Sequence, residues 1–388
     1  MPDGTKAITI RPVSGIDHVA AAEWDACAGP DNPFLSHAFL SALEQSGSAA
    51  AKSGWAPRHL LAEDADGHVM ACAPLYVKSH SFGEYVFDWS WAEAWQRAGH
   101  DYYPKLQCAV PFTPVAGPRL LVRPQMQGLG LDLGLAAAMV QMTQAAGLSS
   151  AHMTFSTEAE ARALAAQGWL LRMGEQYHWR NDGYACFDDF LAALSSRKRK
   201  TIRKERERAN GLGVDILTLT GADIKARHWD AFHRFYLDTV EKKWAHAYLT
   251  RDFFARLGEA MADRVVLIMA EQDGRLVAGA LNLRGGDTLY GRNWGAEGEF
   301  KYLHFEMCYY RAIDFAIEHG LARVEAGAQG EHKVSRGYLP VPTWSAHWIR
   351  EAPLRAAVAG FLEREREAVA ENIRELAEAG PFRDGGGG

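Results

Sequence analysis

Apolar positions in the second half of the chain form three strand-like runs between residues 264 and 295. The runs are rich in Val, Leu, Ile and Tyr, and they are separated by Asp273-Gly274 and by Gly285-Gly286. Asp-Gly and Gly-Gly pairs favour hairpin turns, because glycine adopts positive φ without strain. The pattern therefore predicts an antiparallel meander of three strands.

A helix and a further strand are predicted after the meander. Apolar residues recur at helical spacing, at Leu303, Met307, Tyr310, Ile313 and Ile317. Gly320 is suited to end this helix, and the short run RVEAG (323–327) follows as a strand. A meander, a helix crossover and a strand predict an α/β (mixed α+β) fold with mixed sheets flanked by helices. A Rossmann fold is excluded, because no strand–GxGxxG–helix unit opens the pattern.

The first half of the chain repeats these features in the same order. LSHAFLSAL (35–43) is similar to LTRDFFARL (249–257), and AEDADGHVMACAPL (62–75) is similar to AEQDGRLVAGALN (270–282). Trp89 and Trp294 follow at similar distances, and Gly147-Leu148 and Gly320-Leu321 precede the last strand of each copy. We therefore predict a tandem duplication, with the Asp66-Gly67 and Asp273-Gly274 turns at equivalent hairpins.

Three amphipathic helices complete the prediction. Residues 187–209 are expected to form one helix whose second half is strongly basic, and residues 224–244 and 354–378 are expected to form two more. The predicted domains are a first half at 1–185, the basic helix with the second half at 186–353, and the C-terminal helix with a glycine tail at 354–388.

Composition narrows the class of protein. The chain has 388 residues, 48% of them hydrophobic and 23% charged, which indicates a folded globular protein. A net charge of −6 restricts any nucleic-acid contact to a local patch. Five scattered Cys without a CxxC pair favour a reducing compartment and argue against zinc, and no metal site is predicted. The sequence contains no run of 18 apolar residues, which a membrane-spanning helix would need, so we expect a cytoplasmic protein.

Four segments resemble the Fem family of peptidoglycan aminoacyltransferases, which have tandem GNAT-type folds. They are NPFLSHAFLSALE (32–44), RKTIRKE (199–205), the block from Thr288 to Gly327, and HKVSRGYLP (332–340). Closer still, the chain resembles the bacterial FemAB-like group of peptidoglycan biosynthesis or recognition proteins over roughly residues 34–350. The resemblance implies a tandem duplicated GNAT-like fold. Fem enzymes carry a phosphate-binding Lys in their first helix where this chain reads Ala42-Leu43-Glu44, so a nucleotide-linked substrate is not implied.

The resemblance places a Lys close to the reacting groups, and the matching residue is Lys333. Lys333 and Arg336 are candidates to supply positive charge to an oxyanion or a donor phosphate, or else they belong to a solvated loop. His332 is a candidate proton acceptor, and Glu306 is a candidate carboxylate facing a cleft or a surface partner. Arg292 and Asn293 end a strand that borders the acyl cleft in GNAT-like folds.

Two further segments are candidate phosphate sites. Arg199, Lys200 and Arg203 are predicted to bind substrate phosphate or a tRNA end through the helix at 197–208, or to form an ordinary solvated face. In the first half, Gln125, Gly128 and Gly130 fit the Q/R-x-x-G-x-G/A loop with which GNAT enzymes hold the pyrophosphate of coenzyme A.

These observations predict an N-acyltransferase that acts on a small-molecule or peptide amine. The donor is expected to be acyl-CoA or aminoacyl-tRNA, bound as a co-substrate, with no tightly bound cofactor. A non-catalytic binding module of the same fold, recognising a cell-wall precursor or a peptide, is the alternative. An RNA-associated protein is a third hypothesis, which the net charge weakens.

Overall fold

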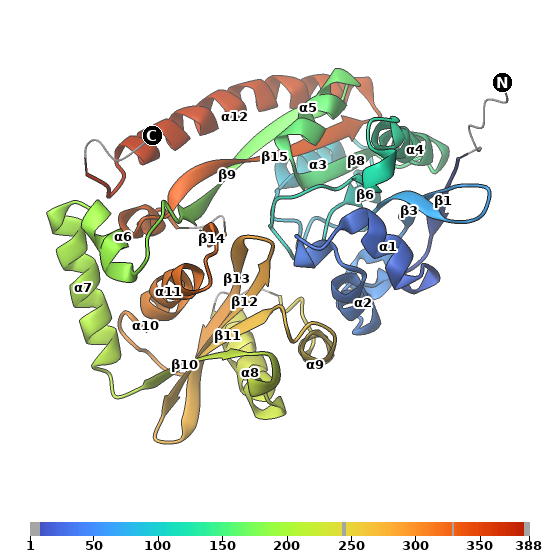
Figure 1. Cartoon of the computed structure of the whole chain (residues 1–388). Helices are drawn as coiled ribbons and strands as arrows, with labels where there is room; N and C mark the ends of the chain where they lie inside the picture. The colour runs from blue at the N-terminus through green and yellow to red at the C-terminus, as the bar shows by residue number, and fades with distance from the viewer. Residues whose placement is uncertain (1–7, 243–245, 328–329, 384–388) are drawn as a thin grey trace. The chain divides into compact units, whose positions relative to one another are not determined.

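The computed structural model describes residues 8–242, 246–327 and 330–383, and the chain divides into two compact units (Figure 1). The first unit comprises Met1–Gly174 and Thr343–Val369, and the second comprises Glu175–Pro342 and Ala370–Gly388. The chain passes between units within β9 (Leu170–Arg180), β15 (Leu339–Ile349) and α12 (Ala352–Glu378). The predicted domains are contiguous in sequence, whereas each compact unit combines two separate segments.

The first unit contains a helical pair, two sheets and a long crossover helix. In chain order its elements are β1 (Thr9–Val13), α1 (Ala21–Ala28), α2 (His37–Gln45), β2 (Trp55–Pro57), β3 (His59–Glu63), β4 (Val69–Ala73), β5 (Leu75–Lys78), α3 (Trp89–Arg97), β6 (Lys105–Cys108), β7 (Leu121–Val122), α4 (Leu131–Ala145), β8 (Ser150–Ser156) and α5 (Glu158–Ala166), followed by parts of β9, β15 and α12. The strands are ordered β1-β3-β4-β7 in one sheet and β15-β8-β6-β5-β2 in the other.

The second unit is built around the strand order β10-β11-β12-β13-β14-β9. Its elements are α6 (Phe187–Ala193), α7 (Ser196–Asn210), β10 (Asp215–Thr220), α8 (Ala226–Lys242), α9 (Arg251–Ala260), β11 (Val265–Gln272), β12 (Arg275–Gly285), β13 (Thr288–Ala296), α10 (Leu303–Phe305), the π-helical turn η6 (Glu306–Tyr310), α11 (Arg311–Glu318), β14 (Arg323–Glu325) and the 3-10 segment η7 (Glu331–Arg336), with parts of β9, β15 and α12. The neighbouring strands pair antiparallel except β13 and β14, which are parallel across the α10–α11 crossover.

Both units follow one order of elements, as the repeated sequence blocks predict. A strand, two helices, a hairpin, another antiparallel strand, a helix and a parallel strand occur in this order in each, ending in the pairs β6–β8 and β13–β14. The first unit has β2, α3 and β7 as additional elements between them. The long strand β12 corresponds to β4 and β5 together, with Pro74 between them. Proline has no backbone N–H to donate to a neighbouring strand, which explains why the strand is interrupted at Pro74. The fold is thus a duplicated mixed α/β unit.

The repeated blocks correspond to repeated local structures. Ser36 and Thr250 cap α2 and α9, and each side chain accepts from the backbone N–H three residues later. Asp66-Gly67 and Asp273-Gly274 turn the β3–β4 and β11–β12 hairpins. Gly147 and Gly320, with φ of 66° and 64°, end the crossover helices in the same Schellman geometry. The predicted hairpin turns and Gly-Leu helix ends are confirmed, and the two caps add a further repeated feature.

The paired caps give a direct test. Replacing Ser36 or Thr250 with Ala removes the side-chain acceptor for one helix N–H, so each helix should lose about 1 kcal/mol of local stability. Hydrogen exchange of α2 and α9 measures the loss. Ser90→Ala, at an exposed position within α3, is the control and should leave both helices unchanged.

Two predictions about local structure are wrong. Trp89 opens α3, whereas Trp294 lies in β13, so the two Trp are not equivalent. The helix predicted at 187–209 is broken between α6 and α7, because buried Leu194 adopts extended backbone and bridges Phe382. The next backbone N–H, that of Ser195, donates to the Pro381 carbonyl. Contacts from the C-terminal segment therefore override the helical pattern.

Candidate active site

Lys333, His332 and Arg336 lie together on η7, in the second unit. Gly337 follows with φ of 91°, and a Cβ there would meet the Phe190 ring at 2.7 Å. Only glycine fits this turn, which holds η7 against the core of the unit. Lys333 and Arg336 are buried, whereas His332 is exposed.

Lys333 is 4% exposed, and its ammonium is held by main-chain oxygens. Nζ donates to the carbonyls of Ala326 at 2.5 Å and Gly327 at 3.1 Å, and it lies 5.7 Å from the centre of the Tyr177 ring. Burial lowers the pKa of Lys333 to about 8. No carboxylate neutralises the ammonium among the contacts of the described residues, so its charge remains available to a ligand.

Arg336 joins η7 to the basic helix. Its guanidinium donates to both carboxylate oxygens of Glu205, at 2.7 and 3.1 Å, and stacks over the Phe305 ring at 3.6 Å. Glu205 also accepts from the Tyr310 hydroxyl. The pair is buried on both sides, which makes Arg336 a structural link between α7 and η7 rather than a free phosphate ligand.

The π-helical turn η6 places two tyrosines at this junction. Tyr309 Oη lies 3.1 Å from Nε2 of His332, and Tyr310 contacts Glu205. One extra residue in the turn lets consecutive Tyr side chains reach two different partners, an arrangement often found at functional sites. Partial desolvation, together with the cations of Arg336 and Lys333, lowers the pKa of His332, so the imidazole is neutral at neutral pH.

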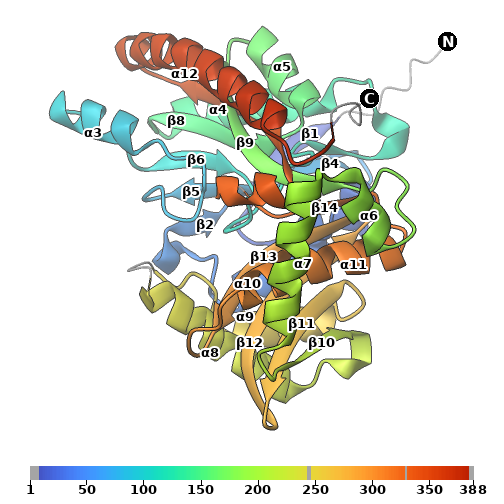
Figure 2. The ribbon, with the colours of Figure 1, turned by 90° about the vertical axis from the view of Figure 1, so that its left-hand side faces the viewer.

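Glu306 is fully buried, and both its oxygens are occupied. Arg206 donates to them at 3.0 and 3.1 Å, and Arg311 donates to Oε1 at 3.0 Å. Arg206 reaches Asp314 as well. We therefore assign Glu306 a structural role, attaching α7 to η6, instead of the catalytic role expected from its position. Figure 2 shows α7 in front of α10 and α11.

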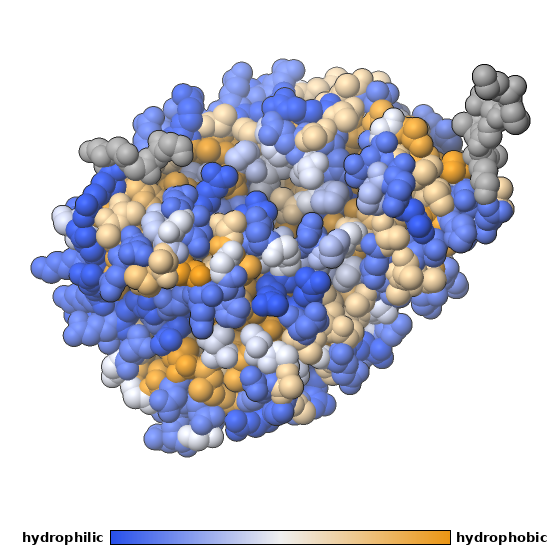
Figure 3. All heavy atoms as spheres, viewed as in Figure 1, coloured by the Kyte–Doolittle hydropathy of each residue, from blue (hydrophilic) through white to orange (hydrophobic). Residues whose placement is uncertain are grey.

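The other residues predicted to bind substrate lie on α7 and β13, outside η7. Arg199 is half-buried, Lys200 and Arg203 are exposed on α7, and Arg203 pairs with Asp188 at 3.1 Å. The face of α7 visible at the left edge of Figure 3 is hydrophilic. Arg292 and Asn293 are half-buried in β13, where Arg292 acts electrostatically on Glu325.

The predicted coenzyme A loop belongs to the first unit. Gln125 lies on a short 3-10 turn after β7, and Gly130 is the N-cap residue of α4, so the predicted strand–loop–helix placement is confirmed. Gly128 and Gly130 have φ of 79° and 75°, and no heavy atom lies within 4 Å of a Cβ built on either. The loop is exposed, and the space beside both glycines is open.

Glu325 is a candidate that the sequence analysis missed. It ends β14, directly before the two carbonyls that hold Lys333, and its buried Oε2 has no hydrogen-bond partner among the described residues. The available signal in the sequence was an acidic residue, Glu325, inside the short predicted strand RVEAG (323–327). What surrounds the side chain depends on β9, which is distant in the sequence.

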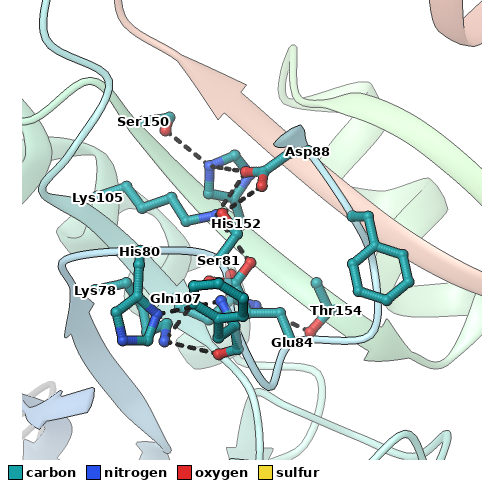
Figure 4. A network of polar contacts seen from close by, with 12 residues as sticks. Lys78, His80, Ser81, Glu84, Asp88, Lys105, Gln107, Ser150, His152 and Thr154 are labelled. Atoms are coloured by element: carbon teal, nitrogen blue, oxygen red, sulfur yellow. Dashed lines mark hydrogen bonds and ion pairs between the residues drawn. The ribbon is translucent and has the colours of Figure 1, made fainter. Parts of the chain in front are cut away.

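A buried polar network in the first unit was also missed (Figure 4). One face of the sheet packs in the apolar core, and the opposite face is polar. The polar positions are Lys105 and Gln107 on β6, Ser150, His152 and Thr154 on β8, and Ser345 and His347 on β15, all buried. The alternation was present in the sequence, but it normally indicates a solvated face.

Lys105 is the centre of this network. Nζ donates to Asp88 at 2.5 Å, Glu84 at 2.8 Å and Ser81 at 2.9 Å, all on the segment between β5 and α3 (Figure 4). Burial alone would lower the pKa of Lys105, but Asp88 and Glu84 outweigh it and raise the pKa. The ammonium therefore stays charged and attaches this segment to the sheet.

A second lysine, Lys78, is less well paired. Nζ donates to the Phe82 carbonyl at 3.1 Å and lies 3.9 Å from Glu84. Burial lowers the pKa of Lys78 to about 7 and raises that of Glu84 to about 7. The arrangement is a structural ion network in which the Lys78–Glu84 pair is the weakly held one.

Solved structures share the fold at low sequence identity. A crystal structure of FemX is 13% identical with a TM-score of 0.56, over 88% of this chain and 99% of that chain. A conserved protein of unknown function from Bacteroides thetaiotaomicron is 11% identical with a TM-score of 0.53, over 88% of this chain and 100% of that chain. A tandem GNAT protein from the clavulanic acid pathway is 14% identical with a TM-score of 0.46, over 89% and 99%. No curated protein sequence matches the chain.

The fold is therefore the duplicated mixed α/β fold predicted from the repeat, and it is similar to that of FemX. The FemAB-like family model, described as peptidoglycan biosynthesis/recognition, matches residues 15–384, and the chain belongs to this family. The resemblance noted in the sequence is confirmed. Among the described residues, no helix has the length and apolarity needed to cross a membrane, and no group of side chains is arranged to hold a metal ion.

Proposed function

We propose that this protein is an N-acyltransferase. It moves an acyl or aminoacyl group from acyl-CoA or aminoacyl-tRNA to an amine of a peptidoglycan-related peptide. The observation that carries the proposal is the buried Lys333 ammonium of η7, fixed by the carbonyls of Ala326 and Gly327 and without a carboxylate partner among the described residues. Family membership supports the general class of reaction and of acceptor.

Acyl transfer develops negative charge on the carbonyl oxygen as the amine attacks. A cation held in place before the reaction stabilises that charge without reorganisation. Lys333 is suited to this role because its ammonium has three N–H donors, and the hydrogen bonds of the described residues use two of them. Arg336, bound to Glu205, keeps η7 and therefore Lys333 in position.

The donor is proposed to bind through phosphate contacts. Lys200 and Arg199 on α7 are available for the phosphates of either donor, and the 125–130 loop is available for the pyrophosphate of coenzyme A. Transfer is tested by incubating the full chain with radiolabelled acetyl-CoA or alanyl-tRNA and peptidoglycan stem peptides, and analysing the products by mass spectrometry. Peptide binding without transfer from either donor would favour the non-catalytic recognition module.

A substitution at Gly128 tests whether the donor is an acyl-CoA bound at the 125–130 loop. Gly128→Val adds a β-branched side chain where backbone amides would otherwise approach a pyrophosphate, so coenzyme A affinity should fall at least about tenfold. Calorimetry with coenzyme A measures the change. Gly99→Val is the matched control, because Gly99 has similar φ, 85°, and equally open space. Equal affinity in both variants would exclude the loop as the donor site.

A further inference from the structure

Three of the five cysteines are buried in the first unit, and two of them lie on facing elements. Cys27 is near the end of α1, and Cys72 is inside β4. The neighbours of Cys72 on its strand, Ala71 and Ala73, pack in the apolar core with residues of α4 and with Cys108. Because successive residues of a strand point to opposite faces, Cys72 points to the other face of β4.

Helix α1 covers this second face of β4. Cys72 is fully buried, and Cys27 Sγ donates to the carbonyl of Val69, also in β4, at 3.6 Å. The second unit repeats the arrangement. Gly279 follows its Asp-Gly turn at the same spacing as Cys72 does, and a Cβ there would meet Phe232 of α8 at 2.8 Å. A helix thus covers this strand position in both units, and in the first unit each side carries a thiol.

The two thiols interact directly. A hydrogen bond from Cys72 is the largest influence on Cys27, and it lowers the pKa of Cys27 although partial burial opposes the change. Arg123 lowers this pKa further; its Nε donates to the Val69 carbonyl at 2.5 Å, and its Nη2 donates to Glu23 at 2.6 Å. Burial and the hydrogen bond to Cys27 raise the pKa of Cys72. Cys27 is therefore the thiol that ionises first, while Cys72 stays protonated beside it.

Access from solvent also differs between the sulfurs. Cys27 keeps 8% of its surface exposed, whereas Cys72 and Cys108 have none. The space beside Gly29, which follows the end of α1, is open. A small oxidant in solvent therefore reaches Cys27 before Cys72.

We propose that Cys27 and Cys72 form a peroxide-sensitive dithiol that closes to a disulfide between α1 and β4. The Cys27 sulfur attacks one oxygen of hydrogen peroxide, the O–O bond breaks, and the departing hydroxide leaves as water with the proton that Cys27 gave up. The Cys72 sulfur then attacks the sulfenic sulfur of Cys27, the S–O bond breaks, and the second hydroxide leaves as water with the Cys72 proton. Two thiols are oxidised to one disulfide, and one peroxide is reduced to two waters.

The inference is independent of the proposed acyl transfer and concerns a modification site. In a reducing compartment, which the five scattered cysteines favour, protein disulfides are mostly transient and report on oxidants. A thiol reductant should therefore reopen the bridge.

The test maps the cysteines after oxidation. The full chain is treated with hydrogen peroxide at neutral pH, alkylated, digested without reductant and analysed by mass spectrometry. A peptide pair linked through Cys27 and Cys72 should appear, and dithiothreitol should remove it. The free Cys27 thiol should be consumed at least about tenfold faster than that of Cys108, because burial raises the pKa of Cys108. The pairing is decided in the unaltered chain, so no substitution has to be tolerated.

Two variants separate the roles of the two sulfurs. Cys72→Ser should stop the reaction at the Cys27 sulfenic acid, which dimedone traps, whereas Cys27→Ser should leave Cys72 reduced. Cys186→Ser is the control, because Cys186 is exposed and its loss should leave the bridge unchanged. A bridge between Cys72 and Cys108, or a Cys27 thiol still reduced after Cys186 has been oxidised, would overturn the proposal.

Discussion

Replacing Lys333 with Ala is expected to lower kcat about 10²–10³-fold, which is the usual effect of removing one donor to a developing oxyanion. The effect on acceptor KM should be small, because the charge on the carbonyl oxygen is present in the transition state and not in the bound substrate. Steady-state kinetics with the donor that proves active measure both constants. A loss confined to KM would show that Lys333 binds substrate uniformly instead.

Two variants serve as comparisons for Lys333. Lys333→Arg should recover little activity, because a planar guanidinium does not fit between the carbonyls of Ala326 and Gly327 as a compact ammonium does. Lys301→Ala, at an exposed lysine of the same unit, should leave kcat unchanged. Because burial lowers the pKa of Lys333 to about 8, the rate of the unaltered protein should fall as the pH rises through that value.

Lys105→Met in the first unit should produce the largest loss of stability, about 3–5 kcal/mol, because it leaves Asp88 and Glu84 buried without their cation. Although burial alone would raise it, the pKa of Asp88 is held below its ordinary range, chiefly by Lys105. The stabilisation by Asp88 is thus present at neutral pH and lost as the pH falls. Hydrogen exchange of β6 and residues 79–88 reports the loss locally.

A neutral version of the network separates charge from packing. Lys105→Met combined with Glu84→Gln and Asp88→Asn removes the uncompensated charges, so this triple variant should recover part of the loss. Lys52→Met, at an exposed lysine of the same unit, should change stability by less than about 0.5 kcal/mol. A single Lys105→Met variant as stable as the Lys52→Met variant would contradict the central role of Lys105.

The sequence by itself determined the features that depend on neighbouring residues. The hairpins at Asp66-Gly67 and Asp273-Gly274 and the helix end at Gly320 were all predicted. Each is set by the backbone preference or side-chain reach of residues within about four positions. Because the two halves repeat these signals in order, they also indicated the tandem fold.

The proposed site depended partly on such local signals and partly on the family resemblance. Lys333, His332 and Arg336 are adjacent in the sequence, so one short segment carries all three. Their partners could not be predicted. Glu205 lies 131 residues before Arg336, so no local pattern relates the two residues.

Tertiary structure alone decided which polar groups are buried and what they contact. The row of His178, Glu325 and Tyr290 requires β9 and β13 to lie on either side of β14, although β9 is more than a hundred residues away in the chain. The network of Lys105 likewise depends on the segment before α3 covering a sheet face that its alternating sequence would place in water. Burial determines whether a carboxylate or an ammonium needs a partner, and burial is a property of the assembled sheet, which no single segment of this chain encodes.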